Sequence, residues 1–344
     1  MKKIVAVCMT MIMAGSMVLT GCSKKNKTDV ENKEKVTQIT MAAFDASREF
    51  LTSYNELFQT HWKEETGKNI EVGQQYGGAG SLTEAMEKDA GEDMALLPDA
   101  HTMQQLEQAG MVKSGWDSRD ANQAVPFTSH VVLLVRKEKA KKITDWGDLV
   151  REGIEVITPD PTVSGMGRWN FLAVYAYAKQ YYRGDTAKIT HFLKKLYSRV
   201  LYMDESGRQA TDRFVENAQG DVLITWESEA YLALEAYPDD YTLVTPSVSV
   251  QAEPAVAVLE QTAGKDQVTK EANGYIQYLY SDEAQRLAAD NYLRPVNEQV
   301  MQEYAGQFTE SAQVFSIEDL GGWEQVWTEC FAEGVLFDQI NPDA

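Results

Sequence analysis

Short apolar segments alternate with amphipathic segments along most of this chain. Residues 131–135 and 156–158 form apolar, β-branched runs that are typical of buried strands. Between residues 50 and 62 the large apolar side chains recur at helical spacing instead. Alternating strands and helices predict an α/β fold, in which helices cover both faces of a largely parallel sheet.

Length and charge narrow the possible architectures and functions. About 310 residues follow the N-terminal segment, too many for one compact core, so we expect two lobes. The formal net charge of -20 argues against nucleic-acid binding, which requires basic surface stripes. It does not exclude an anionic ligand, because surface charges are screened while backbone amides at a helix start act locally.

The N-terminus predicts export and lipid anchoring. Lys2 and Lys3 precede an apolar run at 4–19, which is the layout of a secretory signal. The run ends in Leu-Thr-Gly-Cys at 19–22, a sequence that resembles the bacterial lipobox. We therefore predict a signal peptide at 1–21, a lipid on Cys22 and a flexible tether over 22–36, with an ordinary cleaved signal as the alternative.

The remaining cysteines and histidines indicate neither a disulfide nor a metal site. Cys8 lies in the signal and Cys22 in the lipobox, so Cys330 is the only thiol of the folded part. It falls in an apolar helical pattern and is expected to be a small buried hydrophobe. The four histidines lack metal-ligand spacing, and we predict no metal and no cofactor.

Two strand-to-helix turns could bind an anion. A glycine-rich turn at 77–81 and the turn at Ser164-Gly165 both open helices, where free backbone amides form an anion site. Taken singly, each turn favours mere tight packing over an anion site. The first lacks the Gly-Lys-Ser/Thr ending of a nucleotide-binding P-loop.

Longer sequence words around these turns resemble the prokaryotic sulfate-binding and thiosulfate-binding proteins along nearly the whole mature chain. They occur in one order: Phe-Asp-Ala-Ser-Arg-Glu at 44–49, His-Trp-Lys-Glu-Glu-Thr-Gly at 61–67, Pro-Phe-Thr-Ser at 126–129, Val-Arg-Lys at 135–137, Val-Ile-Thr-Pro-Asp-Pro at 156–161, Gly-Arg-Trp-Asn at 167–170, Gly-Asp-Val-Leu-Ile-Thr-Trp-Glu at 220–227, Ala-Glu-Pro at 252–254 and Phe-Asp-Gln-Ile at 337–340.

The resemblance implies a fold, a function and partners. The fold would be the two-lobe, type II periplasmic-binding-protein fold, with a mainly parallel sheet flanked by helices in each lobe and a ligand cleft between them. Residues 37–127 and 250–344 would form one lobe and 128–249 the other. The function would be substrate binding for an ABC-type sulfate or thiosulfate uptake system, by a monomeric, non-enzymatic lipoprotein on the outer face of the cytoplasmic membrane. Its partners would be the permease and its ATPase.

The family's ligand contacts can be carried over to this sequence. The resemblance places them at Asp45, Gly78, Ala79, Ser164, Gly165, Met166, Gly207 and Trp226, with Arg208 beside one amide. Such a site binds a dehydrated oxyanion through amides, hydroxyls and an indole N–H, because many charge-assisted hydrogen bonds must replace its water.

Three departures leave the exact ligand open. Ala79 stands where the family has a contacting serine, and Ser81 is a candidate replacement donor. Met166 stands where a glycine is usual. Glu205 replaces a small residue, and a carboxylate facing the ligand would favour a protonated oxyanion.

Other readings of the site are kept as alternatives. The ligand could be another oxyanion, such as molybdate or a phosphorylated or sulfonated small molecule. A surface hydrolase would use Asp204, Glu205 or Glu227, although an acid in the first turn of a helix also suits the helix dipole. The tyrosines of the expected helix at 166–182 are expected mainly in the core, with one able to reach the cleft.

Overall fold

The computed structural model describes residues 36–88 and 91–341. The predicted signal peptide, Cys22 and the tether up to residue 35 lie outside these residues and stay predictions.

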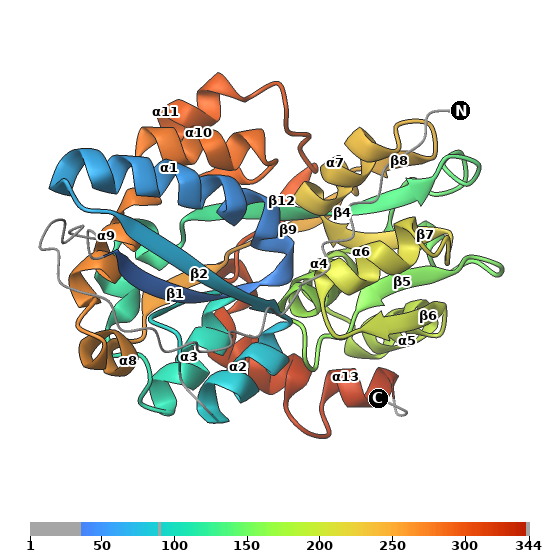
Figure 1. Ribbon diagram of the computed structural model, residues 1–344. Helices are drawn as coiled ribbons and strands as arrows, with labels where there is room; N and C mark the ends of the chain where they lie inside the picture. Colours follow the sequence, from blue (N-terminus) through green and yellow to red (C-terminus); the bar gives the residue numbers. More distant parts are fainter. Residues whose placement is uncertain (1–35, 89–90, 342–344) are drawn as a thin grey trace, which may run out of the picture. The chain divides into compact units, whose positions relative to one another are not determined.

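The first of two sheets has the strand order β10-β3-β1-β2. Its strands β1 and β2 lie side by side in Figure 1. Strand β1 runs parallel to β2 and β3, whereas β10 is antiparallel to β3. The bounds are β1 (Thr37–Phe44), β2 (Ile70–Gly77), β3 (Met94–Leu97) and β10 (Ala255–Val258). This is the largely parallel sheet that the sequence predicts.

The second sheet has the order β12-β9-β4-β7-β5-β6, with β8 and β11 also paired to β4. Its strands are β4 (Phe127–Arg136), β5 (Val156–Pro159), β6 (Val200–Asp204), β7 (Val222–Trp226), β8 (Tyr241–Val244), β9 (Val248–Ala252), β11 (Arg294–Pro295) and β12 (Gln313–Phe315). Strand β5 is parallel to β6 and β7, but β4 is antiparallel to β7, β8, β9 and β11. The sheet is thus mixed rather than mainly parallel, because an apolar run marks a buried strand without encoding its direction.

Helices cover both faces of both sheets, as the α/β order predicts. In β4, Val131 and Leu133 belong to the core shared with α4, whereas Val132 and Leu134 pack with α6 and α7. The helices are α1 (Arg48–Thr66), α2 (Ala79–Lys88), α3 (Ala100–Gln108), α4 (Gly165–Tyr181), α5 (Thr186–Tyr197), α6 (Gly207–Val215), α7 (Glu227–Ala236), α8 (Glu260–Lys265), α9 (Thr269–Tyr278), α10 (Asp282–Asp290), α11 (Glu298–Glu303), α12 (Gly322–Val326) and α13 (Leu336–Ile340). Successive side chains of such a strand are buried alternately against the helices on one face and on the other. The strand sequence is therefore a continuous apolar run.

The chain passes from the first sheet to the second between β3 and β4 and returns between β9 and β10. After that return, however, β12 pairs with β9, and Phe331 and Phe337 pack on Phe171 of α4. The residues after the return thus contact the second sheet's side through β12 and these rings, whereas α9 contacts β10 of the first sheet, and the lobe boundaries stay a prediction. Cys330 is buried, as its apolar pattern predicts.

Candidate functional site

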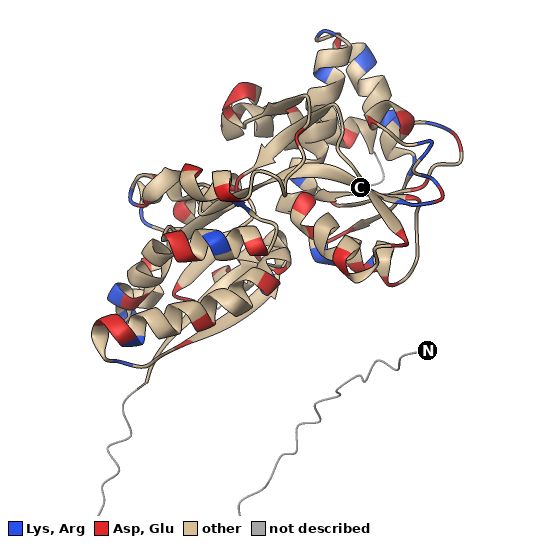
Figure 2. Ribbon diagram, turned by 90° about the horizontal axis from the view of Figure 1, so that it is seen from above, with Lys and Arg blue, Asp and Glu red and all other residues tan. Residues whose placement is uncertain are grey.

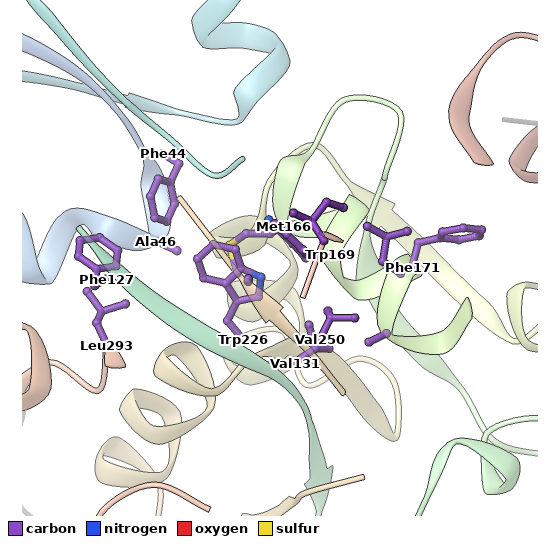
Figure 3. Close-up of a cluster of buried hydrophobic side chains, with 14 of the residues drawn as sticks. Phe44, Ala46, Phe127, Val131, Met166, Trp169, Phe171, Trp226, Val250 and Leu293 are labelled. Atoms are coloured by element: carbon purple, nitrogen blue, oxygen red, sulfur yellow. The ribbon is translucent and has the colours of Figure 1, made fainter. Parts of the chain in front are cut away.

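Turns at the carboxyl ends of strands from the two sheets contact one another. The backbone amide of Gly80, after β2, donates to the carbonyl of Val163, after β5, at 2.9 Å. The rings of Phe44, at the end of β1, and Trp226, at the end of β7, pack edge to face with centroids 5.6 Å apart (Figure 3). Ligands of open α/β sheets bind at such strand ends, so this junction is the candidate site.

The start of α4 offers one hydroxyl and two amides. Ser164 is the N-cap, and its Oγ accepts from the Gly167 amide at 3.2 Å, which leaves its O–H free to donate. The amides of Gly165 and Met166 precede the first intrahelical hydrogen bond and can point at an anion. Glycine is required at 165, because an added Cβ would lie 2.3 Å from Asp99 Oδ2.

The start of α6 is joined to the first sheet through Asp45. Ser206 caps this helix and also donates through its Oγ to the Asp45 carboxylate, which accepts the Arg208 backbone amide as well. Burial raises the pKa of Asp45. The amide of Gly207, the first residue of α6, stands beside these bonded groups as the predicted donor. The resemblance assigns Asp45 a role through its amide; its carboxylate, in addition, joins the two sheets.

The terminal nitrogens of the Arg208 guanidinium are paired with acids, and its Nε is buried without a partner among the described residues. Its Nη1 donates to Glu49 Oε1 at 2.8 Å, and its Nη2 donates to Glu229 Oε1 at 2.9 Å. More generally, Figure 2 shows lysine and arginine interspersed with acidic residues along the chain. An anion here would depend on backbone dipoles and neutral donors, not on a salt bridge.

The glycine-rich turn contributes close packing and a buried methyl group. A Cβ on Gly78 would lie 2.4 Å from the Glu205 carbonyl, so the turn fits closely only with glycine at this position. Ala79 is 2 % exposed. Ser81 is exposed and donates to the Gly78 carbonyl at 3.0 Å, so its hydroxyl is already bonded within its own turn. The Glu205 side chain is exposed too.

Trp226 has the most informative side chain of the cluster. It is 0 % exposed, and its Nε1 has no hydrogen-bond partner among the described residues. Two of the buried hydroxyls that lack a partner among the described residues lie beside Trp226 along the chain or the sheet. Ser228 follows Trp226 by two residues, and Ser129 precedes by two residues Val131, which pairs with Trp226. A buried donor without an acceptor costs about 1–3 kcal/mol, so this arrangement favours a site that receives an acceptor. Sequence reasoning named neither serine as a ligand contact, although Ser129 ends the Pro-Phe-Thr-Ser word at 126–129.

A buried ion pair beside the site was also missed. Arg168 of α4 donates through Nη2 to Asp99 Oδ2 at 2.8 Å, and Trp169 Nε1 donates to the Pro98 carbonyl at 2.8 Å. Arg168 and Asp99 are 5 % and 0 % exposed in their side chains. An arginine inside an apolar aromatic helix was the available signal, because such a charge is buried only with a partner.

The acids considered for hydrolysis are engaged elsewhere or exposed. Asp204 receives bonds from Arg213 Nε at 2.8 and 2.9 Å. Glu227 is fully buried and bonded to Arg294. With Glu205 exposed, the geometry brings together no pair of free carboxylates from this set.

The tyrosines of α4 and the histidines lie in other surroundings. Tyr175 packs on Phe171, Tyr177 packs on Phe192, and Tyr181 is 65 % exposed. Over residues 36–88 and 91–341 there is no group of three or more His, Cys, Asp or Glu able to hold a metal. Within the same residues no helix is both apolar and long enough to cross a bilayer.

Glu229 gives a pH-dependent prediction. Burial raises its pKa from 4.5 to about 7, although Arg208 acts in the opposite direction. Between these values the folded chain holds a proton that the unfolded chain releases, so stability falls as pH rises. We expect this group to contribute a decrease on the order of 3 kcal/mol between pH 4.5 and 7, and Glu229→Gln to remove it. Urea unfolding of both proteins at several pH values measures the difference; parallel profiles would contradict the assignment.

Comparisons with known proteins agree with this geometry. The model of the family "Bacterial extracellular solute-binding protein" matches residues 39–294. The sulfate-binding protein of Escherichia coli is 39 % identical over 309 residues, covering 89 % of this chain and 94 % of that protein. The thiosulfate-binding protein of Pseudomonas aeruginosa is 37 % identical over 301 residues, covering 87 % and 90 %.

Solved structures give the same result. The sulfate-binding protein SubI from Mycobacterium tuberculosis has 34 % identity and a TM-score of 0.76, covering 84 % of this chain and 98 % of that one. A periplasmic thiamin-binding protein, with 16 % identity and a TM-score of 0.63 over 84 % and 93 %, shares the fold. This chain belongs to the bacterial extracellular solute-binding proteins, in the family that contains the sulfate-binding and thiosulfate-binding proteins.

Proposed function

We propose that this chain is the substrate-binding component of an ABC-type sulfate or thiosulfate uptake system and captures a tetrahedral oxyanion between its two sheets. The observation that carries the proposal is the buried indole N–H of Trp226 at the junction of strand ends, which has no partner in the described part of the chain. The Ser164 hydroxyl and the free amides that open α4 and α6 supply further neutral donors. Relatives named for sulfate and thiosulfate support the choice of ligand.

In this proposal the lobes at 37–127 with 250–344 and at 128–249 close around the anion by a hinge motion. The crossing strands β4 and β9 form the hinge, where Ser249 Oγ donates to the Val131 carbonyl at 2.7 Å and accepts the Val131 amide at 3.1 Å. The Asp99–Arg168 pair and the Asp45–Ser206 bond stabilise the closed form. Closure replaces the water around the anion with fixed donors.

The cellular setting follows from the same proposal. The chain is exported, loses residues 1–21 and is anchored through a lipid on Cys22, as a monomer outside the cytoplasmic membrane. It delivers its ligand to the permease and ATPase and catalyses no reaction itself. Molybdate and phosphorylated or sulfonated compounds are the alternative ligands, and a hydrolase using Asp204, Glu205 or Glu227 is the alternative class.

Thermal unfolding of the chain from residue 23 onward, with a panel of anions, tests the ligand class. A ligand that binds only the folded state adds about 2.7 kcal/mol at a hundredfold excess over its Kd. We expect sulfate, thiosulfate or both to raise Tm clearly, and phosphate to leave it unchanged at the same ionic strength.

Other outcomes would redirect the assignment. A rise with molybdate or a sulfonate alone would replace the proposed ligand within the same class. No rise with any anion would contradict oxyanion binding, and product formation from a phosphate or sulfate ester would favour the hydrolase.

A further inference from the structure

Ala79 lies between two contacts that join the glycine-rich turn to the second sheet. On one side, Gly78 packs against the Glu205 carbonyl: a Cβ built on Gly78 would lie 2.4 Å from that oxygen. On the other side, the Gly80 amide donates to the Val163 carbonyl at 2.9 Å. The Ala79 methyl group is buried between these contacts at the first position of α2. This part of the site thus presents a carbon surface that donates no side-chain hydrogen bond.

Met166 brings a second soft group to the same junction. Its side chain is 2 % exposed, and its Sδ would lie 2.1 Å from a Cβ built on Gly207. Position 207 therefore accommodates only glycine, because the Met166 thioether occupies the space that a larger side chain at 207 would need. Figure 3 shows Met166 near the indole of Trp226. The thioether is therefore close to the start of α6.

Alanine and methionine alter which anion fits such a site. Sulfate has four equivalent oxygens, each of which requires hydrogen-bond donors once its water is removed. A methyl group donates nothing and a thioether sulfur is only a weak acceptor, so an oxygen directed at them is left unsatisfied. Thiosulfate has the same tetrahedral shape, but its terminal sulfur is larger, more polarizable and a weaker acceptor. Contact with a methionine thioether and a methyl group suits such an atom.

We propose that Ala79 and Met166 form a soft corner of the site, which receives the terminal sulfur of thiosulfate and makes the chain prefer thiosulfate to sulfate. The inference rests on the proposed oxyanion-binding function and names its substrate. The three oxygens of thiosulfate take the donors at Ser164, at Gly207 and at Trp226.

Isothermal titration of the wild type, Ala79→Ser and Met166→Gly with sodium thiosulfate and sodium sulfate tests this inference. We expect the wild type to bind thiosulfate at least ~10-fold more tightly, since one unsatisfied oxygen costs roughly that factor. Each substitution is expected to shift the ratio of the two Kd values toward sulfate by ~10-fold. Ser81→Ala, which removes an exposed hydroxyl bonded to its own turn, is the matched control and should leave the ratio unchanged.

The outcomes separate this inference from the function on which it rests. Binding of neither anion by the wild type would contradict the proposed function. Equal affinities, or a ratio that neither substitution moves, would overturn the soft corner while oxyanion binding stands. Methanesulfonate, which carries a methyl group in place of the terminal sulfur, is the third ligand: tighter binding of methanesulfonate than of thiosulfate would also overturn the assignment. Should Met166→Gly fail to fold, Ala79→Ser alone decides.

Discussion

Glu227→Gln is expected to lower the free energy of unfolding by about 3 kcal/mol, because it leaves a buried arginine without its main counter-charge. Arg294 and Glu227 are 6 % and 0 % exposed in their side chains. Arg294 Nη2 donates to Glu227 Oε2 at 3.0 Å, and the His130 amide donates to Glu227 Oε1 at 3.2 Å. Glutamine keeps the shape but removes the charge. Glu310, which also accepts from Arg294, keeps the expected loss at the lower end of the range for broken buried pairs.

Glu303→Gln is the matched control. It also removes the carboxylate partner of an arginine, but both Glu303 and Arg286 are 39 % exposed, and a solvated pair contributes little. Denaturant unfolding of the three proteins measures the difference. A loss for Glu227→Gln no larger than that for Glu303→Gln would show that water or Glu310 replaces the pairing.

Much of the fold was predictable from local patterns. The apolar runs at 131–135 and 156–158 are strands because both of their faces are covered by helices, as shown by the division of neighbouring residues between two cores. The expected helix at 166–182 corresponds to α4 within one residue at each end, since the Ser164 cap fixes its start. The direction of β4 was not predictable, because burial of a strand does not depend on which way it runs.

The candidate site was only partly predictable. The turns at 77–81 and 164–165 could be found because amides at a helix start bind anions irrespective of the surrounding sequence. The Asp99–Arg168 pair joins positions 69 residues apart in sequence, so only the folded chain reveals it. The contact between Met166 and Gly207 is also visible only in the folded chain. Neither residue alone indicates that the Met166 side chain fills the space beside Gly207.

Trp226→Phe is expected to weaken binding of the preferred oxyanion by roughly 10-fold to 100-fold, the effect of losing one hydrogen bond to a charged group. Phenylalanine retains an aromatic ring to pack against Phe44 but removes the Nε1 donor. This donor has no partner among the described residues, so its removal breaks no hydrogen bond described in the fold. Stability without ligand should therefore change little while affinity falls, and titration calorimetry together with thermal unfolding measures both.

Trp146→Phe provides the opposite pattern as a control. In the unsubstituted chain, Trp146 Nε1 donates to the Val248 carbonyl at 2.7 Å, and the Trp146 side chain is fully buried. The same chemical change there removes a bond of the fold, so the unfolding free energy should fall by about 1–3 kcal/mol with affinity unchanged. If Trp226→Phe instead lowered stability and left affinity intact, the indole would be a core group and the oxyanion would have to bind elsewhere. If affinity alone falls, the unpartnered donor at the end of β7 is reserved for the ligand.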